Sequence, residues 1–216
     1  MFRPFEKTSE SLIAGEFSAP PSPEFSLEER RTLLHIAHSA IRSALDRPAH
    51  DHPTLDHQRF SEAPPPGLSE PRGIFTTLYL GGQLRGCVGY AMPVAPLYRA
   101  VAETACAAAF DDSRFVPVTK EEAPSLQIAL SVLSRLFAIR PECVEVGRHG
   151  LVISRGARRG LLLPQVPVEN GWDRDTFLQQ TCRKAGLPLD AWQTGATIEA
   201  FTAEVFADGD LKISEQ

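Results

Sequence analysis

The chain has 216 residues, of which 43% are hydrophobic and 23% are charged, as is ordinary for a soluble globular protein of one or two domains. Its formal net charge of −5 and its pI near 5.7 argue against a surface that binds nucleic acid or anionic membranes. No apolar run approaches the length that crosses a bilayer, and the N-terminus lacks a signal-peptide core. We therefore expect a cytoplasmic protein.

The cysteines exclude several kinds of metal protein. The four of them, Cys87, Cys106, Cys143 and Cys182, lie far apart and form no CxxC pattern, which argues against a zinc ribbon or an iron–sulfur cluster. In a reducing compartment they are expected to be thiols. We predict neither a metal nor a cofactor.

The N-terminal part of the chain predicts an arm, a helix and a loop. Residues 1–25 are proline-rich, without periodicity, and we expect a flexible arm. Ser26 and Glu29 form a capping-box pattern, and apolar residues follow at helical spacing as far as Ala44. Residues 47–72 contain six prolines and predict a loop.

Metal-ligand residue types gather inside this loop, at His50, Asp51, His52, Asp56 and His57. Because a proline-rich loop offers no scaffold to fix ligand geometry, we favour a solvated loop over a metal site.

A β-hairpin is predicted next, with strands at 73–80 and 83–90 joined by Gly81 and Gly82. In a regular second strand, Leu84, Val88 and Tyr90 face the core, and Arg85, Cys87 and Gly89 share the opposite face.

This second strand is the first candidate site. A guanidinium at Arg85 would favour the thiolate of Cys87, and the missing side chain of Gly89 would leave room beside the sulfur. The alternative is that Cys87 is a small buried hydrophobe and that the glycines only ease packing.

The rest of the chain repeats one order of elements. Pro96 precedes a helix running to about Phe110, which a polar turn at 111–115 and a strand at 127–133 follow. The second half predicts a hairpin within 149–163, a helix that Asp173 caps and Gly186 ends, and a strand at 197–206. Hairpin, helix and strand thus occur twice, at about 73–134 and 149–207, before a tail at 208–216. This order predicts an α+β fold of two related units, with mainly antiparallel sheet and helices packed on it.

Eight short blocks resemble the successive motifs of the AMMECR domain family. They are GIFTTL (73–78), LRGCVG (84–89), DSRF (112–115), SVLS (131–134), GRHG (147–150), GLLLPQV (160–166), GWD (171–173) and KAGL (184–187). The resemblance covers about residues 26–207 and implies a two-lobed α+β fold with a cleft. For prokaryotic members, which include protein A of the AmmeMemoRadiSam system, it also implies two partners, a Memo-like protein related to extradiol dioxygenases and a radical-SAM protein. Ser113 and Pro167 depart from the pattern, and the family supplies no established reaction.

Two functions from different classes follow. In the first, the chain is an enzyme or enzyme subunit that handles a small anionic substrate. Its candidate catalytic residues are Cys87 and His149, and its candidate substrate-binding residues are Arg85, Gly86, Gly89, Arg114 and Gln165. For Arg114 a local ion pair with Asp111 or Asp112 is the favoured alternative.

In the second, the domain is a non-catalytic binding or scaffold module that docks on the Memo-like partner. A nucleotide-binding protein has no support, because neither GxGxxG nor GxxxxGK[ST] occurs. The cysteine triplet of a radical-SAM enzyme is also missing.

Overall fold

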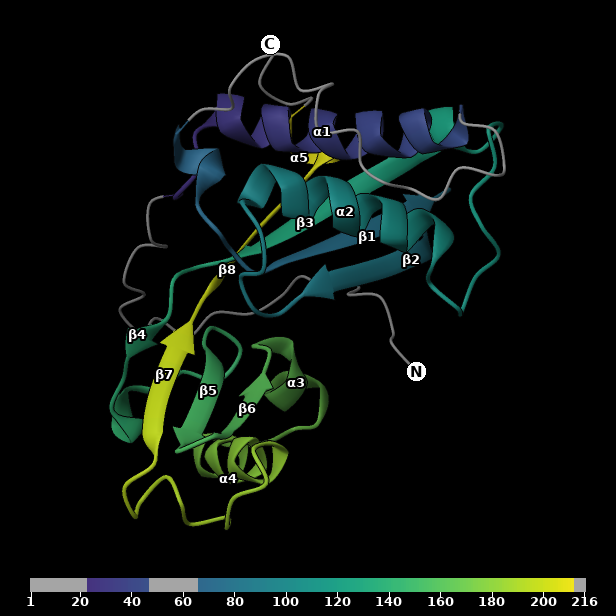
Figure 1. Ribbon diagram of the computed structural model, residues 1–216. Helices are drawn as coiled ribbons and strands as arrows, with labels where there is room; N and C mark the ends of the chain where they lie inside the picture. The colour runs from purple at the N-terminus through teal and green to yellow at the C-terminus, as the bar shows by residue number, and fades with distance from the viewer. Residues whose placement is uncertain (1–22, 47–65, 212–216) are drawn as a thin grey trace, which may run out of the picture.

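The computed structural model describes residues 23–46 and 66–211, which form two four-stranded antiparallel sheets (Figure 1). The histidine-rich stretch at 50–57 and residues 1–22 of the predicted arm lie outside these residues. The predicted boundary of the arm at residue 25 is wrong, because Phe25 is buried in the core. The larger sheet has the strand order β2-β1-β3-β8, built from β1 (Ile74–Leu80), β2 (Gln83–Tyr90), β3 (Leu126–Leu133) and β8 (Ala203–Ala207). Both turn glycines of the first hairpin have positive φ, 57° at Gly81 and 78° at Gly82, as the sequence predicted.

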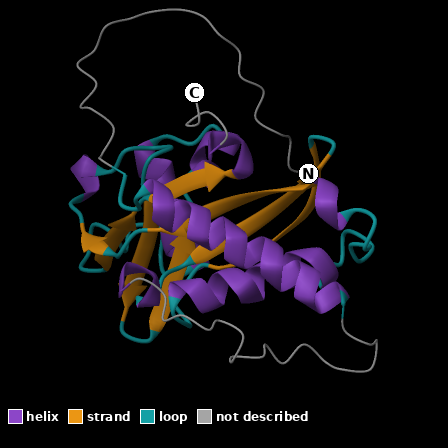
Figure 2. Cartoon of the chain, turned by 90° about the horizontal axis from the view of Figure 1, so that it is seen from above, coloured by secondary structure: helices purple, strands orange, loops and turns teal. Residues whose placement is uncertain are grey.

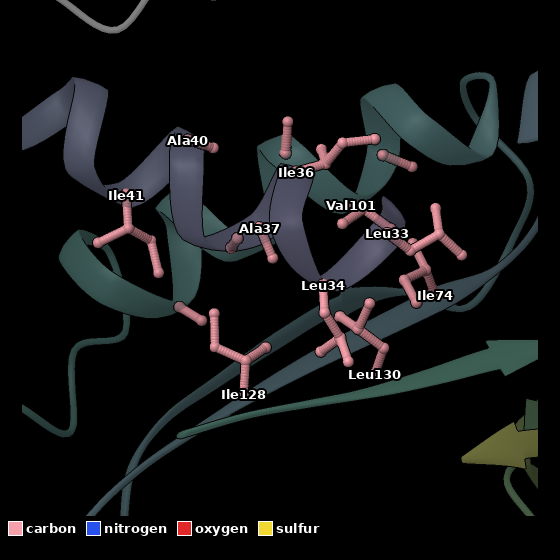
Figure 3. Packing of buried hydrophobic residues seen from close by; sticks show 14 of the residues in the cluster. Leu33, Leu34, Ile36, Ala37, Ala40, Ile41, Ile74, Val101, Ile128 and Leu130 are labelled. Atoms are coloured by element: carbon pink, nitrogen blue, oxygen red, sulfur yellow. The ribbon is translucent and has the colours of Figure 1, made fainter. Parts of the chain in front are cut away.

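Two helices cover one face of the larger sheet, α1 (Leu27–Leu45) and α2 (Leu97–Phe110), which lie side by side in Figures 1 and 2. The predicted capping box starts α1, because Ser26 Oγ accepts from the amide of Glu29 while Glu29 accepts from the amide of Ser26. Apolar side chains of both helices interlock with those of the strands (Figure 3). No helix among the described residues is long and apolar enough to span a membrane.

The smaller sheet has the order β4-β7-β5-β6, and α4 (Arg174–Lys184) packs against it. Its strands are β4 (Phe137–Ala138), β5 (Gly150–Arg155), β6 (Arg158–Leu162) and β7 (Thr197–Phe201). Asp173 caps α4 as predicted, and Gly186 with φ of 70° ends it. The remaining short helices are α3 (Gln165–Glu169), α5 (Asp208–Leu211) and the 3₁₀ turns Pro66–Ser69, Ala123–Ser125 and Pro141–Cys143.

The predicted repeat is confirmed, and its two units exchange strands. In both sheets the second hairpin strand is at the edge, the first lies inside it, and the strand after the helix comes next. The fourth strand of each sheet comes from the other unit. β4 follows β3 in the chain but pairs with β7, and β8 follows β7 in the chain but pairs with β3.

The single final strand predicted at 197–206 is therefore wrong. The chain changes sheets at Thr202, where Ser134 N donates to Thr202 O at 2.8 Å and Thr202 N donates to Ser134 Oγ at 3.0 Å.

The two lobes meet through a small apolar cluster that is centred on Leu133, Val152 and Phe201. Beside it a cleft of about 570 Å³ opens at the junction, with Arg72, Ser134, Phe137 and Thr202 among its lining residues. The expected two-lobed α+β fold with a cleft is confirmed.

Candidate active site around Cys87

Cys87 lies on β2, at the edge of the larger sheet and opposite Thr77 of β1. Its side chain is half-buried, and the hydroxyl of Thr77 donates to Cys87 Sγ at 3.3 Å. Cys87 is therefore less buried than Cys106 and Cys182, which are 8% and 0% exposed. None of the four cysteines forms a disulfide, and burial raises the pKa of Cys182.

The guanidinium expected beside this thiol is not that of Arg85. The pairing of β1 with β2 contains a bulge, since Leu78 faces Gly86 while Tyr79 faces Leu84, which leaves Arg85 as the extra residue. A bulge shifts the alternation of side chains by one residue, so Leu84 rather than Arg85 is in phase with Cys87. The predicted arrangement of this face is corrected accordingly.

Arg85 instead ties the loop after α2 to the sheet. Its Nε and Nη2 donate to Glu122 at 3.1 and 3.0 Å, and its Nη1 donates to the carbonyl of Val116 at 2.7 Å. These hydrogen bonds lower the pKa of Glu122, with the Arg85 side chain as the main cause. Each guanidinium nitrogen is bonded to protein and the side chain is 11% exposed, so this geometry favours a structural role.

The two candidate glycines of this strand are packing positions. A Cβ at Gly86 would lie 2.1 Å from the carbonyl oxygen of Ala108 on α2, so the glycine permits close contact between helix and sheet. A Cβ at Gly89 would lie 2.4 Å from the ring of Phe75. The space that we expected beside the sulfur at Gly89 is therefore filled by that ring.

Asp112 and Arg114 hold the backbone of Cys87 from outside the sheet. Cys87 N donates to Asp112 Oδ2 at 2.9 Å, and Arg114 Nη2 donates to Cys87 O at 3.3 Å. The two side chains also pair with each other, with Arg114 Nη2 at 2.7 Å from Asp112 Oδ2, as the local ion pair predicted. We call Asp112 and Arg114 the clamp. The hydrogen bond from Arg114 is the main cause that holds the pKa of Asp112 well below its usual range.

Arg114 is also a cation whose charge interacts with that of Cys87. Its pKa is raised, first by the hydrogen bond to Asp112 and also by the charges of Asp112 and Cys87. Its side chain is 47% exposed, and Nη1 makes no hydrogen bond to any described residue. The sequence predicts Asp112 only as a possible ion-pair partner of Arg114 and not as a contact of Cys87. The sequence signal that could have pointed to this pair is an Asp and an Arg two residues apart, directly after the end of a helix.

The other two predicted residues belong to the smaller lobe. His149 is buried just before β5, where its Nδ1 accepts from the amide of Glu145 at 3.0 Å and its ring meets Phe137 edge-on. Gln165 is exposed at the start of α3. Within the described residues, no hydrogen bond or ion pair joins either side chain to Cys87. The structure thus brings Cys87 together with Arg114 but not with His149 or Gln165.

Comparison with known sequences decides the family. The sequence model of the AMMECR1 family matches residues 34–206. The chain belongs to the AMMECR1 family. Among similar proteins, Protein MK0488 of Methanopyrus kandleri is 41% identical over 197 residues, covering 86% of this chain and 91% of the relative. A relative from Aquifex aeolicus is 38% identical and covers 82% of this chain and 92% of its own length.

A solved AMMECR1 structure shares the fold. The crystal structure of the uncharacterized protein PH0010 from Pyrococcus horikoshii is similar with a TM-score of 0.60 and 40% identity. That likeness covers 83% of this chain and 91% of the other. In this AMMECR1 chain the blocks at 84–89 and 112–115 meet at Cys87, through its hydrogen bonds to Asp112 and Arg114.

The environment of His149 predicts a pH dependence of stability. Burial lowers the pKa of His149 from 6.5, with the charge of Glu145 opposing this effect and that of Arg148 adding to it. Below pH 6.5 the unfolded chain therefore binds more protons at this residue, and the free energy of unfolding falls as the pH decreases.

Urea unfolding at pH 7 and at pH 5.5 measures this loss. The His149→Asn variant keeps an acceptor for the Glu145 amide and is expected to lose less stability over that interval. An equal loss in both proteins would contradict the assignment.

Proposed function

We propose that this AMMECR1 domain handles a small anionic electrophile, with Cys87 as the nucleophile and Arg114 as the group that holds the anion. The supporting observation is the partly buried Cys87, whose carbonyl accepts a hydrogen bond at 3.3 Å from the Arg114 guanidinium, a group with one nitrogen that bonds to no described residue. The proposal keeps the substrate class predicted from the sequence and replaces Arg85 by Arg114 as the cation.

The chemistry follows from these groups. A thiolate is the nucleophilic form of cysteine, and a negative charge on Sγ interacts favourably with the Arg114 guanidinium. Arg114 Nη1 suits a carboxylate or phosphate oxygen of a molecule whose electrophilic carbon reaches the sulfur. The thiol first gives its proton to water, and as the S–C bond forms, the bond from that carbon to its leaving group breaks and the leaving group departs with the electron pair. The domain would work as an enzyme or as the subunit of one, with the Memo-like and radical-SAM proteins as proposed partners.

A pair of alkylating reagents tests this site. Iodoacetate and iodoacetamide place the same electrophilic carbon on an anion and on a neutral molecule. In a Cys143→Ala background, which removes the exposed thiol, we expect Cys87 to prefer iodoacetate about fivefold more than glutathione does, equivalent to about 1 kcal/mol of charge interaction. Rates are measured by mass spectrometry of the Cys87 peptide.

The Arg114→Gln variant is expected to return this ratio to the glutathione value. The matched control is Arg148→Gln, which removes another exposed, ion-paired arginine from the smaller lobe and is expected to keep the preference. The proposal is contradicted if Cys87 is not alkylated in the folded protein. It is also contradicted if the ratio of the iodoacetate rate to the iodoacetamide rate is the same in Arg114→Gln as in the protein with Arg114.

A further inference from the structure

The edge of the larger sheet is closed at Cys87 by side chains instead of a strand. Residues of an antiparallel strand alternate in the side to which their amide and carbonyl point. The amide and carbonyl of Cys87 both bond to the clamp, so they point away from β1. On an edge strand these groups are exposed unless something covers them.

The clamp supplies both partners that a neighbouring strand would supply. Asp112 offers the acceptor for the amide, and Arg114 offers the donor for the carbonyl. The clamp comes from the turn after α2, 25 residues along the chain from Cys87 at Asp112. The same turn donates Arg114 N to Asp112 Oδ1 at 3.2 Å, so the carboxylate is held from three sides.

Burial makes this arrangement rigid. The Asp112 side chain is 6% exposed, and the hydrogen bonds it accepts favour its ionised form. Hydrogen bonds with an ionised partner are about twice as strong as those between neutral groups. Opposite the clamp, the Thr77 hydroxyl contacts the sulfur of the same residue. Cys87 is thus fixed through its backbone on one side and through its side chain on the other.

We propose that Asp112 is the positioning residue of the Cys87 site, with Arg114 as its partner in the clamp. Asp112 holds the edge strand so that the thiol stays against Thr77 and within range of the Arg114 guanidinium. The importance of this positioning for chemistry rests on the proposed function, whereas the positioning itself does not.

Hydrogen exchange of single amides tests the positioning without any reaction. In Asp112→Ala we expect the amide of Cys87 to exchange at least ten times faster, while that of Val88, which points toward β1, keeps its rate. Asp112→Asn keeps an acceptor oxygen and is expected to restore most of the protection. The control is Glu145→Ala, which removes an exposed carboxylate paired with arginine in the smaller lobe.

Two outcomes overturn the proposal. Unchanged exchange at Cys87 in Asp112→Ala shows that the clamp does not hold the strand. Equal acceleration at Cys87 and Val88 shows that Asp112 supports the whole sheet instead of this residue. If the exchange pattern is as expected but Cys87 shows no preference for iodoacetate, the positioning stands and the proposed function fails.

Discussion

Replacing Gly86 with alanine is expected to destabilise the protein by about 3 kcal/mol. The added Cβ would lie 2.1 Å from the carbonyl oxygen and 3.0 Å from the carbonyl carbon of Ala108. Both atoms are backbone, so no side chain can rotate away, and α2 must move off the sheet. This movement would loosen a core that includes Ala105, Ala108 and Leu78. Urea unfolding followed by circular dichroism measures the loss.

The control for this substitution is Gly209→Ala. No atom lies within 4 Å of a Cβ at Gly209, so this variant is expected to change stability by less than about 0.5 kcal/mol. If Gly86→Ala is as stable as the control, the helix and sheet do not contact each other as closely as described.

The second large effect concerns the junction between the lobes. Phe201 is 1% exposed, and its loss in Phe201→Ala is expected to cost about 3–5 kcal/mol. Gly150 lies under this ring, because a Cβ there would be 2.2 Å from Phe201 Cζ. Gly150→Ala alone is therefore expected to cost about 2 kcal/mol through overpacking.

The double variant separates contact from general damage. With the ring removed, the alanine at position 150 has room, so the two losses are expected to fall short of additivity by about 1 kcal/mol or more. Four unfolding curves at one pH complete this cycle. Losses that add within about 0.5 kcal/mol would show that Gly150 and Phe201 do not share this space.

Local patterns predicted most single elements. The capping box at Ser26 located the start of α1, and the glycine pair at 81–82 located the first hairpin turn. The second hairpin was predicted less well, because the sequence placed it only within 149–163, whereas the structure shows a turn of two residues, Gly156 and Ala157, between the paired Arg155 and Arg158. Periodicity cannot resolve such a boundary, because Arg155 and Arg158 are as acceptable in a strand as in a turn.

The features that form the candidate site depend on contacts between distant residues. The bulge at Arg85 cannot be predicted from the hydrophobic pattern of so short a strand, because an apolar Leu84 is compatible with either face of the sheet. The bond from Asp112 to the amide of Cys87 and the sheet change at Thr202 both need the partner segment to be known. The sequence therefore singled out Cys87 as a candidate but did not predict which side chains lie beside it.

The exchange of β4 and β8 makes the two lobes interdependent during folding. β8 pairs with β3 through residues that lie far apart in the chain, such as Ala129 and Ala207. The larger sheet therefore cannot be completed until the C-terminal strand is present. During synthesis on the ribosome, β3 is made long before β8. Until β8 is made, the edge of β3 that will pair with it has unpaired backbone amides and carbonyls. A cut between the two units, after β4, would take β8 from the larger sheet and β4 from the smaller sheet, so neither half is a natural unit for truncation, and circular permutants are better opened elsewhere.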